Sequence, residues 1–523
     1  MKEKIISGKT YLGIELGSTR IKASLIDDTY TPVASGGYNW ENKYENGYWT
    51  YSLDEVHKGI KSCYASLRAD VKEKYGVELT CFASIGISGM MHGYLPFDAD
   101  GNLLTAFRTW RNTTTQKASS ELTQLFGFNV PQRWSISHLY QAILNGEAHI
   151  PDVNKITTLA GYIHYLLTGR HEVGIGEASG IFPISGNTYD EDMIAKFRLL
   201  TQNSPLKKDI LSILPDVKTA GDTGAVLTPE GAAFLDETGN LKPGIPLCPP
   251  EGDAGTGMVA TNSVKPGTGN ISAGTSIFAM LVLEKNLSRL YEEVDIVCTP
   301  AGHPVAMVQC NNCCGEIDNW VNLFGEFASL SGNPLDKTSL YGLLYNEALK
   351  GDADCDGIVS FNYLSGEHIT GVKTGVPMTL RNQSSKLTVA NFIRSQLYST
   401  MATLKIGMDI IENESAVTER IQAHGGLFKI KGVAQQLLAN ALNTAVSVTE
   451  TASEGGAWGM ALLAAYMIKG DGAPFGEWLE ANVFAGMSSS TLLPDEDGVK
   501  GFAAYTERYK LYLDAQRSLG ELI

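Results

Sequence analysis

The chain has 523 residues, of which 43% are hydrophobic and 19% charged, and its formal net charge is −16. This length is too great for one hydrophobic core and fits two large domains. The acidic balance argues against nucleic acid or an anionic membrane as the main partner. The sequence contains no apolar run of membrane-spanning length, and residues 1–9 lack the apolar segment of a signal peptide, so we expect a cytoplasmic protein.

The eight cysteines are expected to be reduced thiols, as in other cytosolic chains of this size. Cys310, Cys313 and Cys314 crowd together and invite a metal interpretation. Only His303 lies nearby as a fourth ligand, and no second cysteine pair follows. Buried structural thiols are therefore the favoured interpretation.

The first half of the chain predicts strands followed by helices. Three consecutive strands are expected at 11–16, 21–27 and 33–35. A helix with apolar residues at helical spacing follows at 56–74, and a strand at 82–88 leads into a glycine-rich turn. Further helices are predicted at 113–126, 138–145 and 156–167.

A cluster of proline and glycine at 242–253 is the strongest break in the chain, and it predicts a domain boundary near residue 258. The expected domains are 1–258 and 259–523. In the second, helices are predicted at 388–411, 431–443, 455–467 and 503–522, and the last helix is expected to pack back on the first domain. Strands followed by helices, twice over, favour two α/β domains.

Two short turns of glycine and hydroxyl residues stand about half a chain apart, at 17–19 and 274–276. Each joins two apolar strands, and such a turn can hold phosphate with backbone N–H groups and small hydroxyls. One copy alone is as readily a plain β-hairpin, and Lys22 beside the first copy is as readily a surface residue as a phosphate ligand. The repetition favours a duplicated fold that grips one nucleotide from both sides of a cleft.

Three glycine-rich segments carry further candidate residues. Asp253 lies in a loop of small residues, where a substrate can approach it closely, although a lone aspartate there is often a turn residue. His92 follows a predicted strand end, where α/β folds collect ligands. Gly425 and Gly426 precede a helix and leave room for a ring or a phosphate, although a simple turn explains them equally well.

Together these segments resemble the FGGY carbohydrate kinases of the actin-like ATPase superfamily, over nearly the whole chain and in the family's order. Residues 13–19 look like the first phosphate motif and 272–276 like the second. Residues 87–93 are similar to the sugar-site segment of the xylulokinase branch, and 425–426 with 454–459 resemble the adenosine-binding end. The resemblance implies an α/β fold of two actin-like, ribonuclease H-like domains around a central cleft.

The resemblance also implies MgATP-dependent phosphorylation of a terminal hydroxyl of a small ketose, with sugar and ATP as partners and a homodimer as the default assembly. Asp253 would accept the hydroxyl proton, and Glu15 would orient water on Mg²⁺. The implied sugar-binding residues are Met91, His92, Trp110, Asn112 and Asp253. The implied ATP-binding residues are Gly17, Ser18, Thr19, Gly274, Thr275, Ser276, Gly425 and Gly426.

Three departures from the family pattern leave the sugar open. Glu15 stands where the family has Asp, Met90 where it usually has Gln, and Arg111-Asn112 replace an Asn-Asp pair. Xylulose is the first expectation, while L-xylulose, ribulose, 6-deoxyketoses and erythritol remain alternatives. Two other functions also stay open: an ATP-driven conformational ATPase of the same superfamily, and a sugar-binding regulator that has lost catalysis through Glu15.

Overall fold

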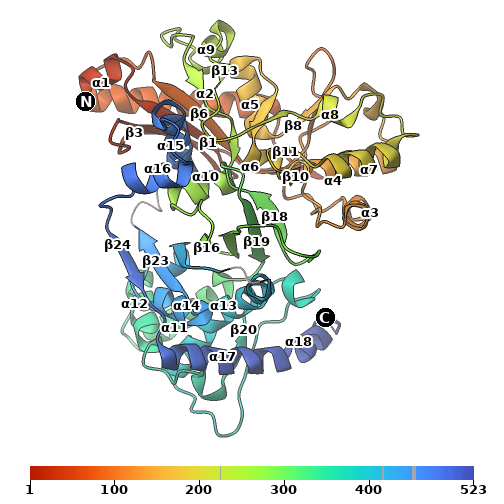
Figure 1. Ribbon diagram of the computed structural model, residues 1–523. Helices are drawn as coiled ribbons and strands as arrows, with labels where there is room; N and C mark the ends of the chain where they lie inside the picture. Colours follow the sequence, from red (N-terminus) through yellow and green to blue (C-terminus); the bar gives the residue numbers. More distant parts are fainter. Residues whose placement is uncertain (224, 415–416, 450–454, 523) are drawn as a thin grey trace.

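The computed structural model describes residues 1–223, 225–414, 417–449 and 455–522. It contains two α/β domains, one above the other in Figure 1, and each is built on a mixed seven-stranded sheet. The predicted fold class is thereby confirmed. The predicted boundary near residue 258 lies inside the helix α10 (Asp253–Ala260) and stays a prediction.

The two sheets share one strand scheme. The first has the order β13-β14-β6-β1-β2-β3 with β15 also on β6, and the second has the order β18-β19-β17-β16-β22-β23-β24. In each, an antiparallel hairpin (β1 with β2, β16 with β17) lies beside a parallel strand, β6 or β22. The first sheet contains β1 (Tyr11–Leu16), β2 (Arg20–Ile26), β3 (Pro32–Asn39), β6 (Ser84–Gly89), β13 (Ala225–Val226), β14 (Pro246–Leu247) and β15 (Glu251–Gly252). The second contains β16 (Thr268–Ala273), β17 (Ile277–Val282), β18 (Asp295–Cys298), β19 (Pro304–Cys310), β22 (Arg420–Gly425), β23 (Ala445–Thr449) and β24 (Ser489–Leu492).

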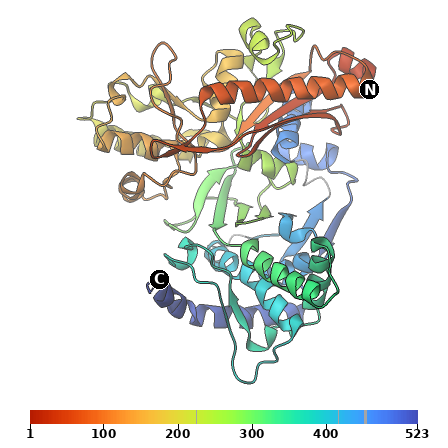
Figure 2. The same cartoon turned by 180° about the vertical axis from the view of Figure 1, so that it is seen from behind.

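Most predicted helices are present with shifted ends. The helix α2 (Leu53–Tyr75) begins at the N-cap Ser52 and ends at the left-handed Gly76, and Figure 2 shows it crossing the back of the first sheet. The other helices of the first half are α1 (Lys2–Ile6), α3 (Gln116–Phe126), α4 (Ser135–Leu144), α5 (Leu159–Thr168), α6 (Ile175–Ala178), α7 (Glu191–Thr201), α8 (Ile210–Ile213) and α9 (Pro229–Leu235). Those of the second half are α11 (Cys314–Leu330), α12 (Lys337–Ala348), α13 (Val389–Asn413), α14 (Val433–Leu442), α15 (Gly455–Lys469), α16 (Phe475–Asn482), α17 (Glu496–Leu511) and α18 (Leu513–Gly520).

Two helix predictions are wrong in extent. The segment expected as one helix at 156–167 begins with the strand β8 (Lys155–Thr157), and α5 starts only after Thr158, whose side chain accepts from the N–H of Gly161. The tail is two helices, α17 and α18, interrupted at Tyr512. Within the described residues, no helix combines the length and apolar character needed to cross a bilayer.

The helix that returns to the first domain is α15, not the last helix. In Figure 1, α15 lies beside the first sheet, far from α17 and α18 at the opposite end of the molecule. The Ser84 hydroxyl on β6 donates to the carbonyl of Ala464 on α15 at 2.6 Å. Arg517 on α18 instead donates to the Thr370 carbonyl of the second domain at 2.7 Å. The expectation fails because α15 is almost wholly apolar and has an apolar sheet face to cover, whereas α18 buries few side chains.

Candidate active site between the two domains

A cleft of about 380 Å³ opens between the two sheets. Both predicted turns reach it, since Ser18 of the first and Ser276 of the second are among its lining residues. Asp253 and Glu15 lie on the same cleft. The full lining is Glu15, Ser18, Met91, His92, Trp110, Arg133, Asp253, Ala254, Gly257, Asn270, Ser276, Phe278, Met307, Gln309, His424, Gly455 and Gly456.

The first turn is held from behind by aromatic side chains. The indole of Trp40 donates to the Gly17 carbonyl at 2.7 Å, and the Tyr51 hydroxyl donates to the Ser18 carbonyl at 2.5 Å. The Ser18 hydroxyl itself accepts from the indole of Trp110 at 3.2 Å. Because the carbonyls are bound on the protein side, the hydroxyl side of the turn is left facing the cleft.

The second turn is held by the start of α11. The N–H groups of Cys313 and Cys314 donate to the carbonyls of Thr275 and Gly274 at 2.9 and 3.1 Å. A Cβ added at Gly274 would meet no protein atom within 4 Å, so the protein itself does not require glycine there. The small residue leaves open space beside the Ser276 hydroxyl for a ligand.

Asp253 is the first residue of α10, directly after the strand β15. The N–H of Met91 donates to its Oδ1 at 3.1 Å and fixes the carboxylate against the segment that follows β6. Burial raises the pKa of Asp253, and hydrogen bonds from backbone N–H groups oppose that rise. A carboxylate with a raised pKa is a stronger proton acceptor once it is ionised.

Glu15 lies next to Asp253 at the end of β1. Burial raises the pKa of Glu15 to about 7, the neighbouring charge of Asp253 adds to the rise, and Lys22 opposes it. Lys22 is the residue paired with Glu15 across the β1–β2 hairpin. A Cβ added at Gly456 would lie 2.6 Å from Oε1 of Glu15, so this glycine of α15 provides the space that the carboxylate occupies.

Two further buried acids, Glu251 and Glu177, lie near Asp253, and the sequence analysis did not single them out as site residues. The Glu251 carboxylate accepts from the N–H groups of Gly176 and Glu177, at 3.3 and 2.9 Å. Burial raises the pKa of Glu251 to about 8 and that of Glu177 well above its ordinary value. The hydrogen bonds anchor the residue two positions before Asp253 to the first turn of α6, and so fix the chain just before α10.

The structure brings together four of the five residues expected to bind the sugar: Met91, His92, Trp110 and Asp253. His92 has a backbone φ of +69°, its Nδ1 lies 3.2 Å from the Gly180 carbonyl, and its ring stacks on Trp134 at 6.2 Å. Burial, with Arg133 nearby, lowers the pKa of His92 well below its ordinary value, so the ring is neutral.

Asn112, the remaining predicted sugar ligand, has its side chain engaged elsewhere. Its Oδ1 accepts from the N–H of Trp49 at 2.8 Å, and its Nδ2 donates to the Trp49 and Thr109 carbonyls at 2.9 Å each. The neighbouring Arg111 guanidinium stacks over the Trp49 ring at 3.9 Å. The amide therefore stabilises the loop that presents Trp110, and it does not line the cleft.

At the expected adenosine end, His424 lines the cleft and the two glycines differ. Gly425 has φ +108°, and a Cβ there would lie 2.2 Å from the Ala273 carbonyl, so strand packing requires this glycine. A Cβ at Gly426 would have its nearest neighbour at 4.0 Å, which leaves space for a ligand. Glu454, at the start of the second expected adenosine segment, lies outside the described residues.

The sequence analysis did not assign several lining residues to the site, among them Arg133, Asn270, Phe278, Met307 and Gln309. Phe278 on β17 faces Gln309 on β19 in the antiparallel register. Met307 and Gln309 are two positions apart, so the alternation of β-strands places both on one face. That alternation was readable in the sequence, but which face borders the cleft was not.

The cleft offers oxygen donors that suit a magnesium ion. Within the described residues, no three His, Cys, Asp or Glu side chains are grouped as metal ligands. Magnesium bound with a nucleotide needs only one or two carboxylates beside the phosphates. Glu15 and Asp253 could supply these. Burial raises the pKa of both carboxyl groups, and a bound cation would favour their ionised forms.

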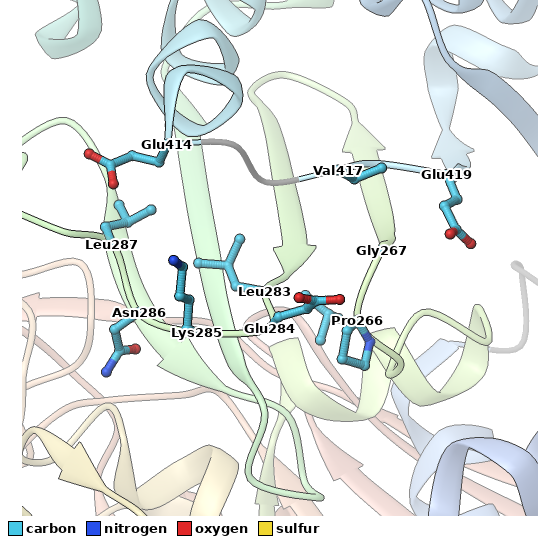
Figure 3. A pocket seen from close by; sticks show the side chains of 11 residues that line it. Pro266, Gly267, Leu283, Glu284, Lys285, Asn286, Leu287, Glu414, Val417 and Glu419 are labelled. Atoms are coloured by element: carbon cyan, nitrogen blue, oxygen red, sulfur yellow. The ribbon is translucent and has the colours of Figure 1, made fainter.

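A second hollow lies away from this chemistry, around the ends of β16, β17 and α13 (Figure 3). Its lining includes three glutamates, Glu284, Glu414 and Glu419, and it also includes Lys285. None of the residues predicted from the sequence borders it. The Glu414 carboxylate is bound by Tyr291 and Ser288, which lower its pKa to about 2.

Comparison with known proteins extends over both domains. Residues 10–259 match the N-terminal domain of the FGGY family of carbohydrate kinases, and residues 269–468 match its C-terminal domain. A xylulose kinase from Haemophilus influenzae is 22% identical over 527 residues, which cover 96% of this chain and 99% of that protein.

Solved structures show the same fold at low identity. A xyloylose kinase from Brucella ovis superposes with a TM-score of 0.78 at 18% identity, over 98% of this chain and 100% of that one. A gluconate kinase from Lactobacillus acidophilus superposes with a TM-score of 0.76 at 16% identity, over 98% of each chain. Since both domains of one family are matched in order along the sequence, the protein belongs to the FGGY family of carbohydrate kinases and is an ATP-dependent kinase of that family.

Proposed function

We propose that the protein transfers the γ-phosphoryl group of MgATP to a terminal hydroxyl of a small ketose, with xylulose as the first candidate. The observation that supports this most directly is the meeting of Asp253 with Ser18 and Ser276 in one cleft. A phosphoryl-transfer site needs positioned phosphates and a proton acceptor beside the attacking hydroxyl, and these residues supply both. The name of the Haemophilus influenzae relative supports xylulose.

In this proposal Asp253 accepts the proton of the sugar hydroxyl as that oxygen attacks phosphorus. Its carboxylate is fixed by the Met91 N–H, so one oxygen remains available to the substrate. The turns at 17–19 and 274–276 hold the β- and γ-phosphates with N–H groups and hydroxyls. Glu15 would help to hold Mg²⁺, which would neutralise charge on the transferred group.

In this proposal the sugar binds at the end of the cleft that Met91, His92 and Trp110 line. The neutral His92 ring, stacked on Trp134, presents an apolar wall and one polar nitrogen to a hydroxylated ligand. Trp110 links this end to the first phosphate turn through its bond to Ser18. A sugar bound against Trp110 therefore lies close to the phosphoryl donor, as in-line transfer requires.

The direct test is ADP release from MgATP across a panel of ketopentoses, deoxyketohexoses, gluconate and polyols, with a no-sugar control. Turnover with a ketopentose far above the control supports the proposal. Turnover with another sugar alone corrects the substrate and keeps the reaction. High ADP release that ignores every sugar identifies a conformational ATPase, and no release with any sugar indicates a regulator without catalysis.

The role of Asp253 is tested separately with Asp253→Asn. Loss of a general base costs about 10²–10⁴-fold in rate, so kcat should fall by that range while nucleotide affinity stays within about twofold. Asp100→Asn, in an exposed loop of the first domain, is the matched control and should retain full activity. Near-normal turnover in Asp253→Asn would remove Asp253 from the mechanism.

A further inference from the structure

Two adjacent thiols lie at the edge of the second phosphate turn, outside the proposed chemistry. Cys313 is the N-cap residue of α11 and Cys314 is its first residue. Their sulfur atoms are 3.6 Å apart. Cys313 is buried and Cys314 is partly exposed, so the pair can be reached from one side.

The sulfur spacing fits a bridging atom better than a disulfide. Disulfide-bonded cysteines usually have Cα atoms 4.4–6.8 Å apart with an S–S bond of about 2.05 Å, whereas adjacent Cα atoms are held at about 3.8 Å. An atom that binds each sulfur at about 2.3 Å, as zinc does, would span 3.6 Å with an S–X–S angle of about 100°. That angle suits a pyramidal centre with two thiolate ligands.

The surroundings favour a ligand that needs two sulfurs and no more. The nearby Cys310 belongs to β19 and is buried opposite Ile277. In the part of the chain that the structure describes, no three such side chains are grouped to hold a metal. Structural zinc takes four protein ligands, so the pair is a poor zinc site. Trivalent arsenic bound to one other substituent requires two thiolates.

The pair is joined directly to the turn proposed to bind phosphate. The N–H of Cys313 donates to the Thr275 carbonyl, and that of Cys314 donates to the Gly274 carbonyl. The Cys313 carbonyl is itself fixed by the amide of Asn362 at 3.0 Å. A bridge between the two sulfurs that rotates the peptide units of Cys313 and Cys314 changes their two hydrogen bonds to the turn. The conformation of the turn then changes as well.

We propose that Cys313 and Cys314 form a dithiol site that binds one trivalent arsenical, and that its occupation weakens ATP binding at the 274–276 turn. Two As–S bonds form, and the two thiol protons leave with the arsenical oxygen as one water molecule, without oxidation or reduction. Cys314 reacts first because it is partly exposed, and Cys313 then closes the ring. The effect on ATP rests on the proposed function, whereas the binding site does not.

The test titrates the full chain with phenylarsine oxide and reads the adduct by intact mass. Wild type should take up one phenylarsenic group per chain. The dithiol 2,3-dimercaptopropanol should remove this group, whereas the monothiol 2-mercaptoethanol, at an equal concentration of thiol groups, should not. When both thiols are present, the second As–S bond forms within the chain, at an effective thiol concentration of about millimolar or higher. Cys314→Ser cannot form this bond, so its uptake should be weaker by roughly a hundredfold. Cys81→Ser, a partly exposed cysteine of the first domain, is the matched control and should behave as wild type.

Equal uptake by wild type and Cys314→Ser, or no uptake by wild type, would overturn the site. Cys313→Ser should match Cys314→Ser, and if it does not fold, the partly exposed Cys314 variant alone remains decisive. The link to ATP is read by equilibrium nucleotide binding: the arsenical should lower MgATP affinity in wild type and leave it unchanged in Cys314→Ser. Uptake with unaltered ATP affinity overturns the link, and uptake by a chain that phosphorylates no sugar overturns only the proposed function.

Discussion

Gly456→Ala should separate catalysis from stability in this protein. The new Cβ would lie 2.6 Å from Oε1 of Glu15 and 2.7 Å from Oγ1 of Thr256. To regain a contact of 3.4 Å, the Glu15 carboxylate must move by about 0.8 Å. A displacement near 1 Å in an active site can cost about 10²-fold, so we expect kcat to fall by about 10- to 100-fold.

The same substitution should leave the fold intact. The crowded atoms are ends of side chains, and alanine gains up to about 1 kcal/mol over glycine in a helix. Disturbing the bond of Thr256 to Ser88, 3.0 Å long, offsets this by about 1 kcal/mol. The free energy of unfolding should therefore change by no more than about 1 kcal/mol.

The assay measures kcat and KM for sugar and ATP together with urea unfolding of the same preparation. Gly342→Ala in α12, where a Cβ would meet no atom within 4 Å, is the control and should raise stability slightly with kcat unchanged. Unchanged kcat in Gly456→Ala would show that the position of Glu15 does not matter for transfer. A large loss of stability would show that the space beside Glu15 is structural.

Three other outcomes are expected. Gly13→Ala should destabilise the protein by about 3 kcal/mol or more in urea unfolding, because its Cβ would lie 2.1 Å from a main-chain carbonyl of α15. Since burial raises the pKa of Asp253, the fall of kcat/KM with decreasing pH should begin above the ordinary aspartate range; a limb at the ordinary aspartate pKa would contradict the role of burial. Glu251, with a folded pKa of about 8 against 4.5 unfolded, contributes stability that is lost as pH rises across that window, so Glu251→Gln should flatten the pH dependence of unfolding there.

The sequence by itself determined the features that depend on neighbours in the chain. Strand–glycine–hydroxyl–strand patterns at 17–19 and 274–276 specify tight hairpins, and the structure has both. Alternation of strands and helices specified two α/β domains. The sequence located the helix ends less well. The apolar periodicity of α5 continues on both sides of its N-cap Thr158, so the pattern alone does not show where the helix begins.

Only the tertiary structure decided which residues meet. An apolar helix such as α15 could cover either domain. Gly13 on β1 lets the backbone of α15 approach the first sheet closely, and α15 packs there. Period-two alternation in β17 and β19 gives two faces, and the packing of the domains decides which face borders the cleft. Gly425 and Asn112 were predicted as ligand contacts, but Gly425 allows close strand packing and Asn112 stabilises a loop. The local sequence shows which contacts a residue can make, and the tertiary structure determines which of them it makes.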